Sequence, residues 1–131
     1  NSTNSSAYNS LAIILVENYS EYDQAKKYYN RAIELSPEND NYYSNLGNLY
    51  LIGINEKEKA ILYYKKSLEI NDLNFVANIM IAIAYFEDTD GSVREKISFE
   101  EAKKYYMKAL KINPLFKRKD LEEFYLNLIL Q

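Results

Sequence analysis

Residues 25–37 read AKKYYNRAIELSP, and this stretch recurs twice further along the chain. The second copy, at 60–72, reads AILYYKKSLEIND, and the third, at 102–114, reads AKKYYMKALKINP. Each copy opens with an alanine, continues with a tyrosine pair and closes with turn-forming residues. Self-similarity at a spacing of 35 and then 42 residues is typical of repeat architectures, in which each repeat is one supersecondary unit.

A second periodic segment precedes each copy. Its mostly apolar or aromatic positions follow the spacing i, i+3, i+4, i+7, which marks one face of an amphipathic helix. These positions are Tyr8, Leu11, Ala12 and Leu15, then Tyr43, Leu46, Gly47 and Tyr50, then Asn78, Ile81, Ala82 and Tyr85. Each unit is therefore predicted to be a helix, a turn and a second helix, which we call helix A and helix B.

The limits and contacts of these helices can also be predicted. Proline cannot continue a helix, and Asn and Asp favour turns, so helix B should end at three short motifs. These are Ser36-Pro37, Asn71-Asp72 and Asn113-Pro114. Small residues should lie where the two helices of a hairpin approach closely. They are Ala12, Gly47 and Ala82 on helix A, and Ala25, Ala60 and Ala102 on helix B.

These residues resemble the tetratricopeptide repeat family, whose unit of about 34 residues carries an aromatic, Leu, Gly and Tyr on helix A and Ala, an aromatic, Ala and Pro on helix B. The second unit shows Tyr43, Leu46, Gly47, Tyr50, Ala60, Tyr64 and Ser67, and the third shows Ile81, Ala82, Tyr85, Ala102, Tyr106, Ala109 and Pro114. Two departures stand out. The first two units have one extra residue between their helices, and the third has seven more, in the stretch Asp88 to Ser98.

The resemblance implies an all-α fold, a right-handed α-solenoid of three hairpins plus a C-terminal capping helix. We expect a polar linker at 1–6, repeats at about 7–39, 40–74 and 75–114, and the capping helix at 115–131. A terminal repeat needs such a cover because its stacking face would otherwise meet water. The insert from Asp88 to Ser98 is expected to be a tolerated surface excursion, because its composition is polar.

Composition argues against several functions. The chain of 131 residues has neither Cys nor His, so it lacks the commonest metal ligand and general base and the best side-chain nucleophile. We expect no enzyme activity, no cofactor and no metal. The net charge of −3 gives no positive field for nucleic acid, and no apolar run, such as Leu11 to Val16, is long enough to span a bilayer. The compartment stays unknown, with a cytoplasmic location favoured.

Two local motifs resemble functional sites but are better explained as ordinary surface structure. The turn from Asp88 to Ser92 does not fit a calcium loop, because aligning Gly91 with the sixth position puts Phe86 at the first and Ile97 at the twelfth. Basic pairs such as Lys65-Lys66 stand beside tyrosine pairs, a combination that can suit RNA. The tyrosines fall on core positions of the repeat, however, so the lysines are interpreted as a solvated helix face.

The resemblance implies a concave groove lined by the helices A, which accepts a peptide or helix of a partner. The matching positions are Asn41, Ser44, Asn45 and Asn48 in the second unit, and Val76, Ile79, Met80, Ile83 and Phe86 in the third. The amides can bond a peptide backbone. The third helix A is apolar on both faces, which is typical of a helix covered on both sides. The cover can be a partner, the insert or the C-terminal helix.

One partner class of the family is disfavoured. Chaperone-binding members hold a C-terminal carboxylate with Lys and Asn from the first helix A, Asn from the second, and Lys and Arg from the third. The matching residues here are Asn9, Ile13, Asn45, Val76 and Met80, of which only Asn45 agrees. Without the cations there is no charge-assisted clamp.

The sequence therefore predicts a protein-protein interaction scaffold that binds a peptide or helix of another protein. The alternative is a self-assembly module in which apolar inner or terminal helices pair two copies into a homodimer. We further expect Met80 and Ile83 to face the groove and to be wet when nothing is bound, so that charging them breaks recognition and spares the fold.

Overall fold

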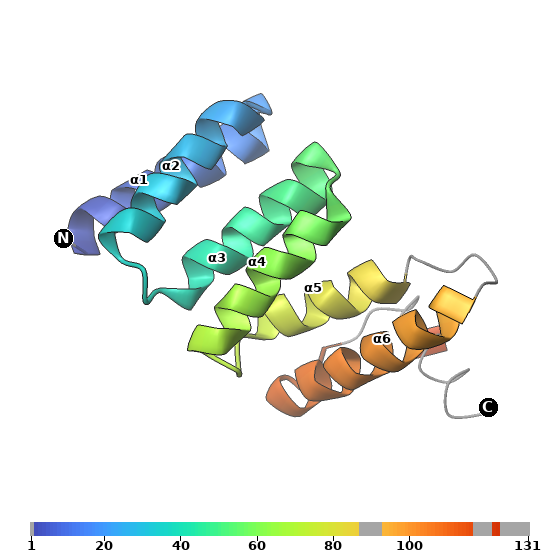
Figure 1. Cartoon of the computed structure of the whole chain (residues 1–131). Coiled ribbons are helices and arrows are strands. Elements are labelled where there is room, and N and C mark those ends of the chain that lie inside the picture. The colour runs from blue at the N-terminus through green and yellow to red at the C-terminus, as the bar shows by residue number, and fades with distance from the viewer. Residues whose placement is uncertain (1, 87–92, 117–121, 124–131) are drawn as a thin grey trace. The chain divides into compact units, whose positions relative to one another are not determined.

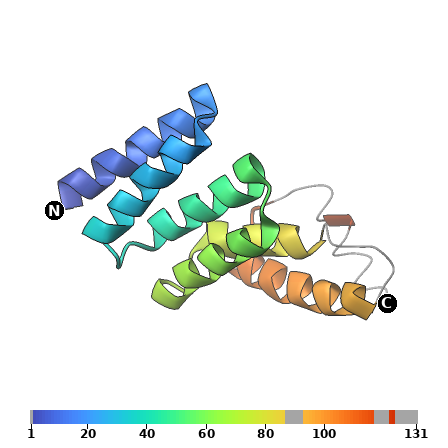
Figure 2. The ribbon, with the colours of Figure 1, turned by 45° about the horizontal axis from the view of Figure 1, so that its top comes forward.

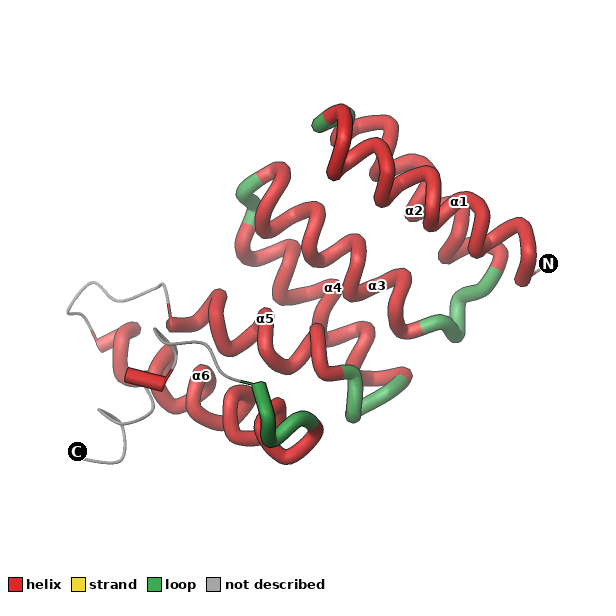
Figure 3. Tube along the Cα trace, turned by 180° about the vertical axis from the view of Figure 1, so that it is seen from behind, coloured by secondary structure: helices red, strands yellow, loops and turns green. Residues whose placement is uncertain are grey.

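The computed structural model describes residues 2–86, 93–116 and 122–123. Within these residues every regular element is a helix (Figure 3), which confirms the all-α class. The chain divides into two compact units, Asn1–Ala77 and Asn78–Gln131.

The first unit contains two helical hairpins. Helices α1 (Ser2–Ile14) and α2 (Tyr22–Leu35) form the first hairpin, and α3 (Asp40–Asn48) and α4 (Lys57–Ile70) form the second. The helices of each pair lie side by side in both views (Figures 1 and 2), and α2 also contacts α3. Short π-helical segments, η1 (Leu15–Tyr19) and η2 (Leu49–Ile54), continue α1 and α3.

Helices α5 (Phe75–Phe86) and α6 (Val93–Ile112) supply helix A and helix B of the third repeat. The rings of Tyr85 and Tyr105 stack between them, with their centroids 6.4 Å apart. The equivalent pair of the second hairpin, Tyr50 and Tyr63, stacks with centroids 5.4 Å apart. The repeat seen in the sequence is therefore also a repeat of side-chain contacts.

The small residues of the repeat lie in the core, as predicted. The six positions are all buried, namely Ala12, Ala25, Gly47, Ala60, Ala82 and Ala102. The closest approach is at Gly47, where an added Cβ would lie 2.6 Å from Cε1 of Tyr64. Large side chains fill the neighbouring space, because Leu46, Tyr64, Ile81 and Tyr106 are also buried. Small residues thus let the helices approach, and large ones fill the grooves between them.

The same turn ends helix B in every repeat. The backbone N–H groups of Ser36, Asn71 and Asn113 donate to the carbonyl four residues earlier. Three residues further on, a second N–H donates back to the carbonyl of that same residue. Helices α2, α4 and α6 end at Leu35, Ile70 and Ile112, which confirms the predicted ends of helix B.

The extra residue between helices A and B of the first two repeats has a structural explanation. A π-helix closes its hydrogen bonds one residue later than an α-helix, so η1 and η2 can absorb an added residue without a longer loop. Both segments end in a left-handed residue, Ser20 with φ 53° and Asn55 with φ 63°. The next N–H, of Glu21 or Glu56, donates to Leu15 or Tyr50, six residues back. The cap residues Ser20 and Asn55 donate to the same two carbonyls, so a left-handed residue ends each helix, as is common at helix C-termini.

The N-terminus differs from the expectation of a polar linker at 1–6. Helix α1 begins at Ser2, and Ser5 is buried. Its Oγ lies 3.1 Å from the hydroxyl of Tyr42 and accepts a hydrogen bond from the Oγ of Ser36 at 2.9 Å. Ser5 can pack in the interior because its hydroxyl finds two partners there, while Asn4 and Ser6 beside it are exposed.

The insert is also only in part the excursion that we expected. Asp88 to Ser92 lie outside the described residues, but Val93 to Ser98 belong to the backbone of α6. Helix α6 has 20 residues where α2 and α4 have 14 each, so most of the added length extends helix B. The predicted capping helix at 115–131 falls almost entirely outside the described residues.

Candidate functional site

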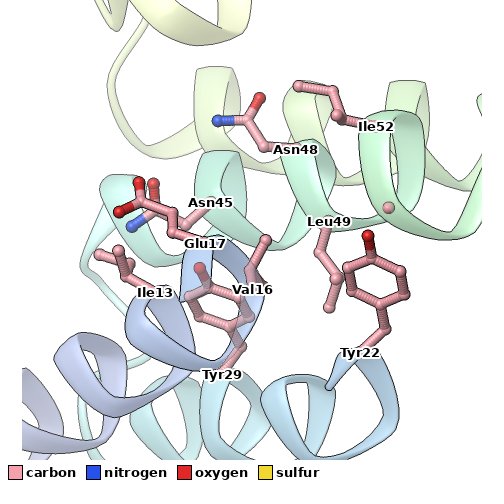
Figure 4. A pocket seen from close by; sticks show the side chains of 10 residues that line it. Ile13, Val16, Glu17, Tyr22, Tyr29, Asn45, Asn48, Leu49 and Ile52 are labelled. Atoms are coloured by element: carbon pink, nitrogen blue, oxygen red, sulfur yellow. The ribbon is translucent and has the colours of Figure 1, made fainter. Parts of the chain in front are cut away.

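A pocket of about 430 Å³ opens in the first unit, where the helices A of its two hairpins come together (Figure 4). Helix α1 and η1 supply one wall, α3 and η2 supply the other, and two tyrosines of α2 complete it. The lining residues are Ile13, Val16, Glu17, Tyr22, Tyr29, Asn45, Asn48, Leu49, Ile52 and Gly53.

Helical periodicity brings these residues to one surface. Asn45, Asn48, Leu49 and Ile52 follow the spacing i, i+3, i+4, i+7 along α3 and η2. Such residues share a helix face. Ile13, Val16 and Glu17 repeat the pattern on the facing helix. The π-helical turns extend each helix A past its α-helical end, so the walls continue to Glu17 and Ile52.

Gly53 admits an aromatic ring to the pocket wall. A Cβ at this position would lie 3.0 Å from Cε1 and 3.1 Å from Cδ1 of Tyr22, tighter than most real contacts. The glycine therefore lets the Tyr22 ring lie close to η2. In the view of Figure 4, Tyr22, Leu49 and Ile52 lie toward one end of the pocket, and Ile13, Glu17 and Asn45 lie toward the other.

Two amides supply hydrogen-bonding groups. The Nδ2 of Asn45 donates to Oδ1 of Asn9 at 3.0 Å, which ties α3 to α1 and leaves the oxygen of Asn45 outside that bond. The Oδ1 of Asn48 accepts a hydrogen bond from the buried Tyr64 hydroxyl at 2.6 Å, so its amide nitrogen points to other acceptors. The pocket thus offers an acceptor and a donor, which are the groups that a peptide backbone needs.

The pocket contains one charged side chain among its lining residues, that of Glu17, which is exposed. Below it, Tyr29 is buried, and burial together with the nearby Glu17 carboxylate raises the pKa of Tyr29 to about 12. The hydroxyl of Tyr29 therefore stays protonated at neutral pH and adds no second negative charge.

The structure places the predicted residues of the second repeat in different surroundings. Asn45 and Asn48 line the pocket. Ser44 is buried, and its Oγ donates to the carbonyl of Asn41 at 3.0 Å. The side chain of Asn41 is exposed and accepts a hydrogen bond from Asn74 at 3.3 Å. Ser44 thus belongs to the local structure of α3, because its hydroxyl is satisfied within the helix.

The predicted residues on α5 are mostly covered. Val76 is 39% exposed, whereas Met80 and Phe86 are half-buried, and Ile79 and Ile83 are only 5% and 7% exposed. The expectation that Ile83 is wet in the free protein is therefore wrong. Its side chain is buried by the chain itself, since a helix that is apolar all round is a buried helix.

The sequence-based prediction stopped short of several lining residues. Val16, Glu17, Leu49 and Ile52 lie in the π-helical turns, whereas the groove residues predicted for the second repeat stop at Asn48. The signal was present, because Leu49 and Ile52 continue the spacing that Asn45 and Asn48 begin. The tyrosines of α2 were not predicted, because only residues of the helices A were assigned to the groove.

No group of three or more carboxylates, imidazoles or thiols is placed to hold a metal ion in the part of the chain that the structure describes. Among the same residues, no helix combines the length and the apolar character that crossing a membrane requires.

Hairpin repeats with a pocket between successive helices A define a helical-repeat protein. Family comparison agrees, because a profile described as "TPR repeat" matches residues 20–52, and one described as "Tetratricopeptide repeat" matches residues 40–72 and 98–114. The chain belongs to the tetratricopeptide repeat family. A comparison with curated proteins gave no match.

Solved structures share the fold at low sequence identity. The first TPR of Spaghetti (RPAP3), bound to the HSP90 peptide SRMEEVD, has a TM-score of 0.80 at 18% identity, over 98% of this chain and 96% of that one. The Arabidopsis OM64 TPR domain has a TM-score of 0.77 at 20% identity, over 97% and 95%. The Sgt2 TPR domain from Aspergillus fumigatus has a TM-score of 0.74 at 19% identity, over 94% of this chain and 75% of that one. These matches support a TPR solenoid fold for the chain.

Proposed function

We propose that the chain is a protein-interaction module that binds a segment of a partner protein in the pocket between α1–η1 and α3–η2. The observation that carries the proposal is Ile52, a large apolar side chain that is 73% exposed at the pocket wall. An exposed apolar side chain beside convergent polar groups is typical of a binding surface.

The surroundings of Ile52 support a peptide-like ligand. Val16 and Leu49 add apolar surface, while Asn45 and Asn48 supply hydrogen-bonding groups that match a peptide backbone. The similar structure of the first TPR of Spaghetti holds a peptide, which supports this class of ligand for the fold. The residues predicted on α5 remain a proposed extension of the binding surface, with exposed Val76 as the most accessible of them.

The test is a screen of a displayed peptide library against the wild type, Ile52→Asp and Leu62→Asp. Leu62 is an exposed leucine of α4 outside the pocket, so its variant makes the same kind of change elsewhere on the surface. Charging Ile52 should weaken the binding of the captured peptides about tenfold or more, because the contact loses about 1.5–3 kcal/mol of transfer energy. Circular dichroism should show unchanged helicity for both variants.

Equal peptide binding by the wild type and Ile52→Asp would contradict the proposal. Sedimentation across a concentration series tests the alternative of self-assembly. Self-association that is lost in Ile52→Asp, without capture of any peptide, would show that a second copy of the chain fills the pocket.

A further inference from the structure

The helices A of this chain have an unusual charge distribution. The segments that form them, residues 2–19, 40–54 and 75–86, contain no lysine and no arginine, although the chain has 16 such residues. Their only side-chain carboxylates are those of Glu17 and Asp40. The basic residues lie on the helices B and at positions 117–119.

The two acids differ in their availability to a ligand. Asp40 accepts hydrogen bonds at Oδ2 from the Nδ2 of Asn71, at 3.0 Å, and of Asn74, at 2.7 Å. Its carboxylate is thus engaged at the turn that follows helix B. Glu17 is exposed and lines the pocket, where it contributes the charge.

We infer that the pocket takes a partner segment in which a large apolar side chain stands next to a lysine or arginine, with Glu17 as the counter-charge. This inference rests on the proposed function and adds the chemistry of the ligand. Both parts of a basic side chain, the methylene stem and the charged end, fit the pocket. Its methylene stem can lie along Ile13 and Val16 while its charged end reaches the carboxylate.

An acidic ligand is disfavoured by the same arrangement. A carboxylate in the pocket would approach Glu17 and would find no lysine or arginine among the lining residues. Like charges brought together at an interface suppress the wrong partner and so provide specificity. The pocket should therefore reject a purely acidic segment such as EEVD, the end of the peptide SRMEEVD in the similar structure of Spaghetti.

The experiment compares four proteins, which are the wild type, Glu17→Gln, Glu17→Lys and Glu69→Gln. Glu69 is an exposed glutamate of α4, so Glu69→Gln removes the same charge away from the pocket. The probes are the library peptide that binds wild type most tightly, a copy with its lysine or arginine changed to glutamate, and EEVD, which has no basic residue. Binding is measured by fluorescence anisotropy at low and high salt.

We expect the library peptides to combine an apolar residue with a basic one. Glu17→Gln should weaken the binding of the selected peptide about two- to fivefold, which is the range for an exposed ion pair. High salt should remove that difference between Glu17→Gln and wild type. Glu17→Lys should prefer the glutamate copy, and Glu69→Gln should bind like wild type. Wild type should not bind EEVD.

The outcomes separate the two proposals. Two results would overturn this inference and leave the binding site in place. The selected peptides could depend on Ile52 but contain no basic residue, or they could bind Glu17→Gln as tightly as wild type. Binding of EEVD by wild type would overturn it too. Failure of the library to yield any peptide sensitive to Ile52→Asp would overturn both.

Discussion

The contact between Gly47 and Tyr64 shows how one residue sets the distance between two helices. The other repeats have alanine at the equivalent positions, Ala12 and Ala82. In the second repeat the Tyr64 hydroxyl is held by Asn48, whereas the first repeat has Ile13 at that position, which cannot accept a hydrogen bond. The bond to Asn48 holds the ring where only glycine leaves room.

Gly47→Ala is therefore expected to destabilise the protein by about 1–3 kcal/mol, although alanine is the better helix former. The added Cβ would lie 2.6 Å from the ring of Tyr64, which is fully buried and cannot easily move. Urea unfolding measures the change. The double variant Gly47→Ala/Asn48→Ile, which installs the residues of the first repeat, should lose less, and an equal loss would show that Asn48 does not hold the ring.

Ser67 offers the opposite case, a residue that the fold would be more stable without. It is fully buried, and its Oγ has no hydrogen-bond partner, while the equivalent residues of the other repeats are Ala32 and Ala109. Ser67→Ala should raise the free energy of unfolding by about 1 kcal/mol, because an unsatisfied buried hydroxyl costs about 1–3 kcal/mol. A lower midpoint in urea would mean that the hydroxyl is bonded.

At the scale of the elements, the residues that follow η1 and η2 must adopt a left-handed backbone conformation. The residues at the two positions differ in how well they tolerate it. Asparagine tolerates this conformation better than serine, so Asn55 suits its position better than Ser20 does. Ser20→Gly should stabilise the protein by about 0.5–1 kcal/mol in thermal or urea unfolding. Asn55→Gly should have a smaller effect, and an equal gain at both positions would contradict this account.

The elements also show what could be predicted from the sequence. Periodicity and turn residues gave the hairpins and the ends of helix B, because those depend on local chemistry that repeats. An extra residue can enter a loop or a π-helical turn at similar spacing, so the sequence could not place it. The π-helical turn extends the groove to Leu49 and Ile52. This explains why only Asn45 and Asn48 of the lining residues were predicted.

At the scale of the whole molecule, burial decides which apolar residues of α5 support the fold and which can serve a partner. Ile83→Asp should lower the free energy of unfolding by about 3 kcal/mol or more, since it buries an unpaired charge. Val76→Asp, at an exposed position of the same helix, should change it by less than about 0.5–1 kcal/mol. Equal stability of the two variants in urea would mean that Ile83 is accessible.

Alkaline pH should destabilise the protein through its buried tyrosines. Burial and the Glu17 carboxylate raise the pKa of Tyr29 to about 12, and burial also raises the pKa of Tyr64. The unfolded chain releases these protons near pH 10, whereas the folded protein holds them, so the unfolded state binds fewer protons above that pH. Stability is therefore fully present below about pH 10 and falls as the pH rises toward about 12.

Each of these tyrosines should contribute about 1.4 kcal/mol per pH unit to that fall. Urea unfolding at a series of pH values measures the slope, and Tyr29→Phe should reduce it by the share of one residue, because phenylalanine fills the same space and cannot ionise. Tyr19→Phe serves as the control, since the side chain of Tyr19 is exposed. A slope that Tyr29→Phe leaves unchanged would show that the Tyr29 hydroxyl is open to solvent and ionises before the protein unfolds.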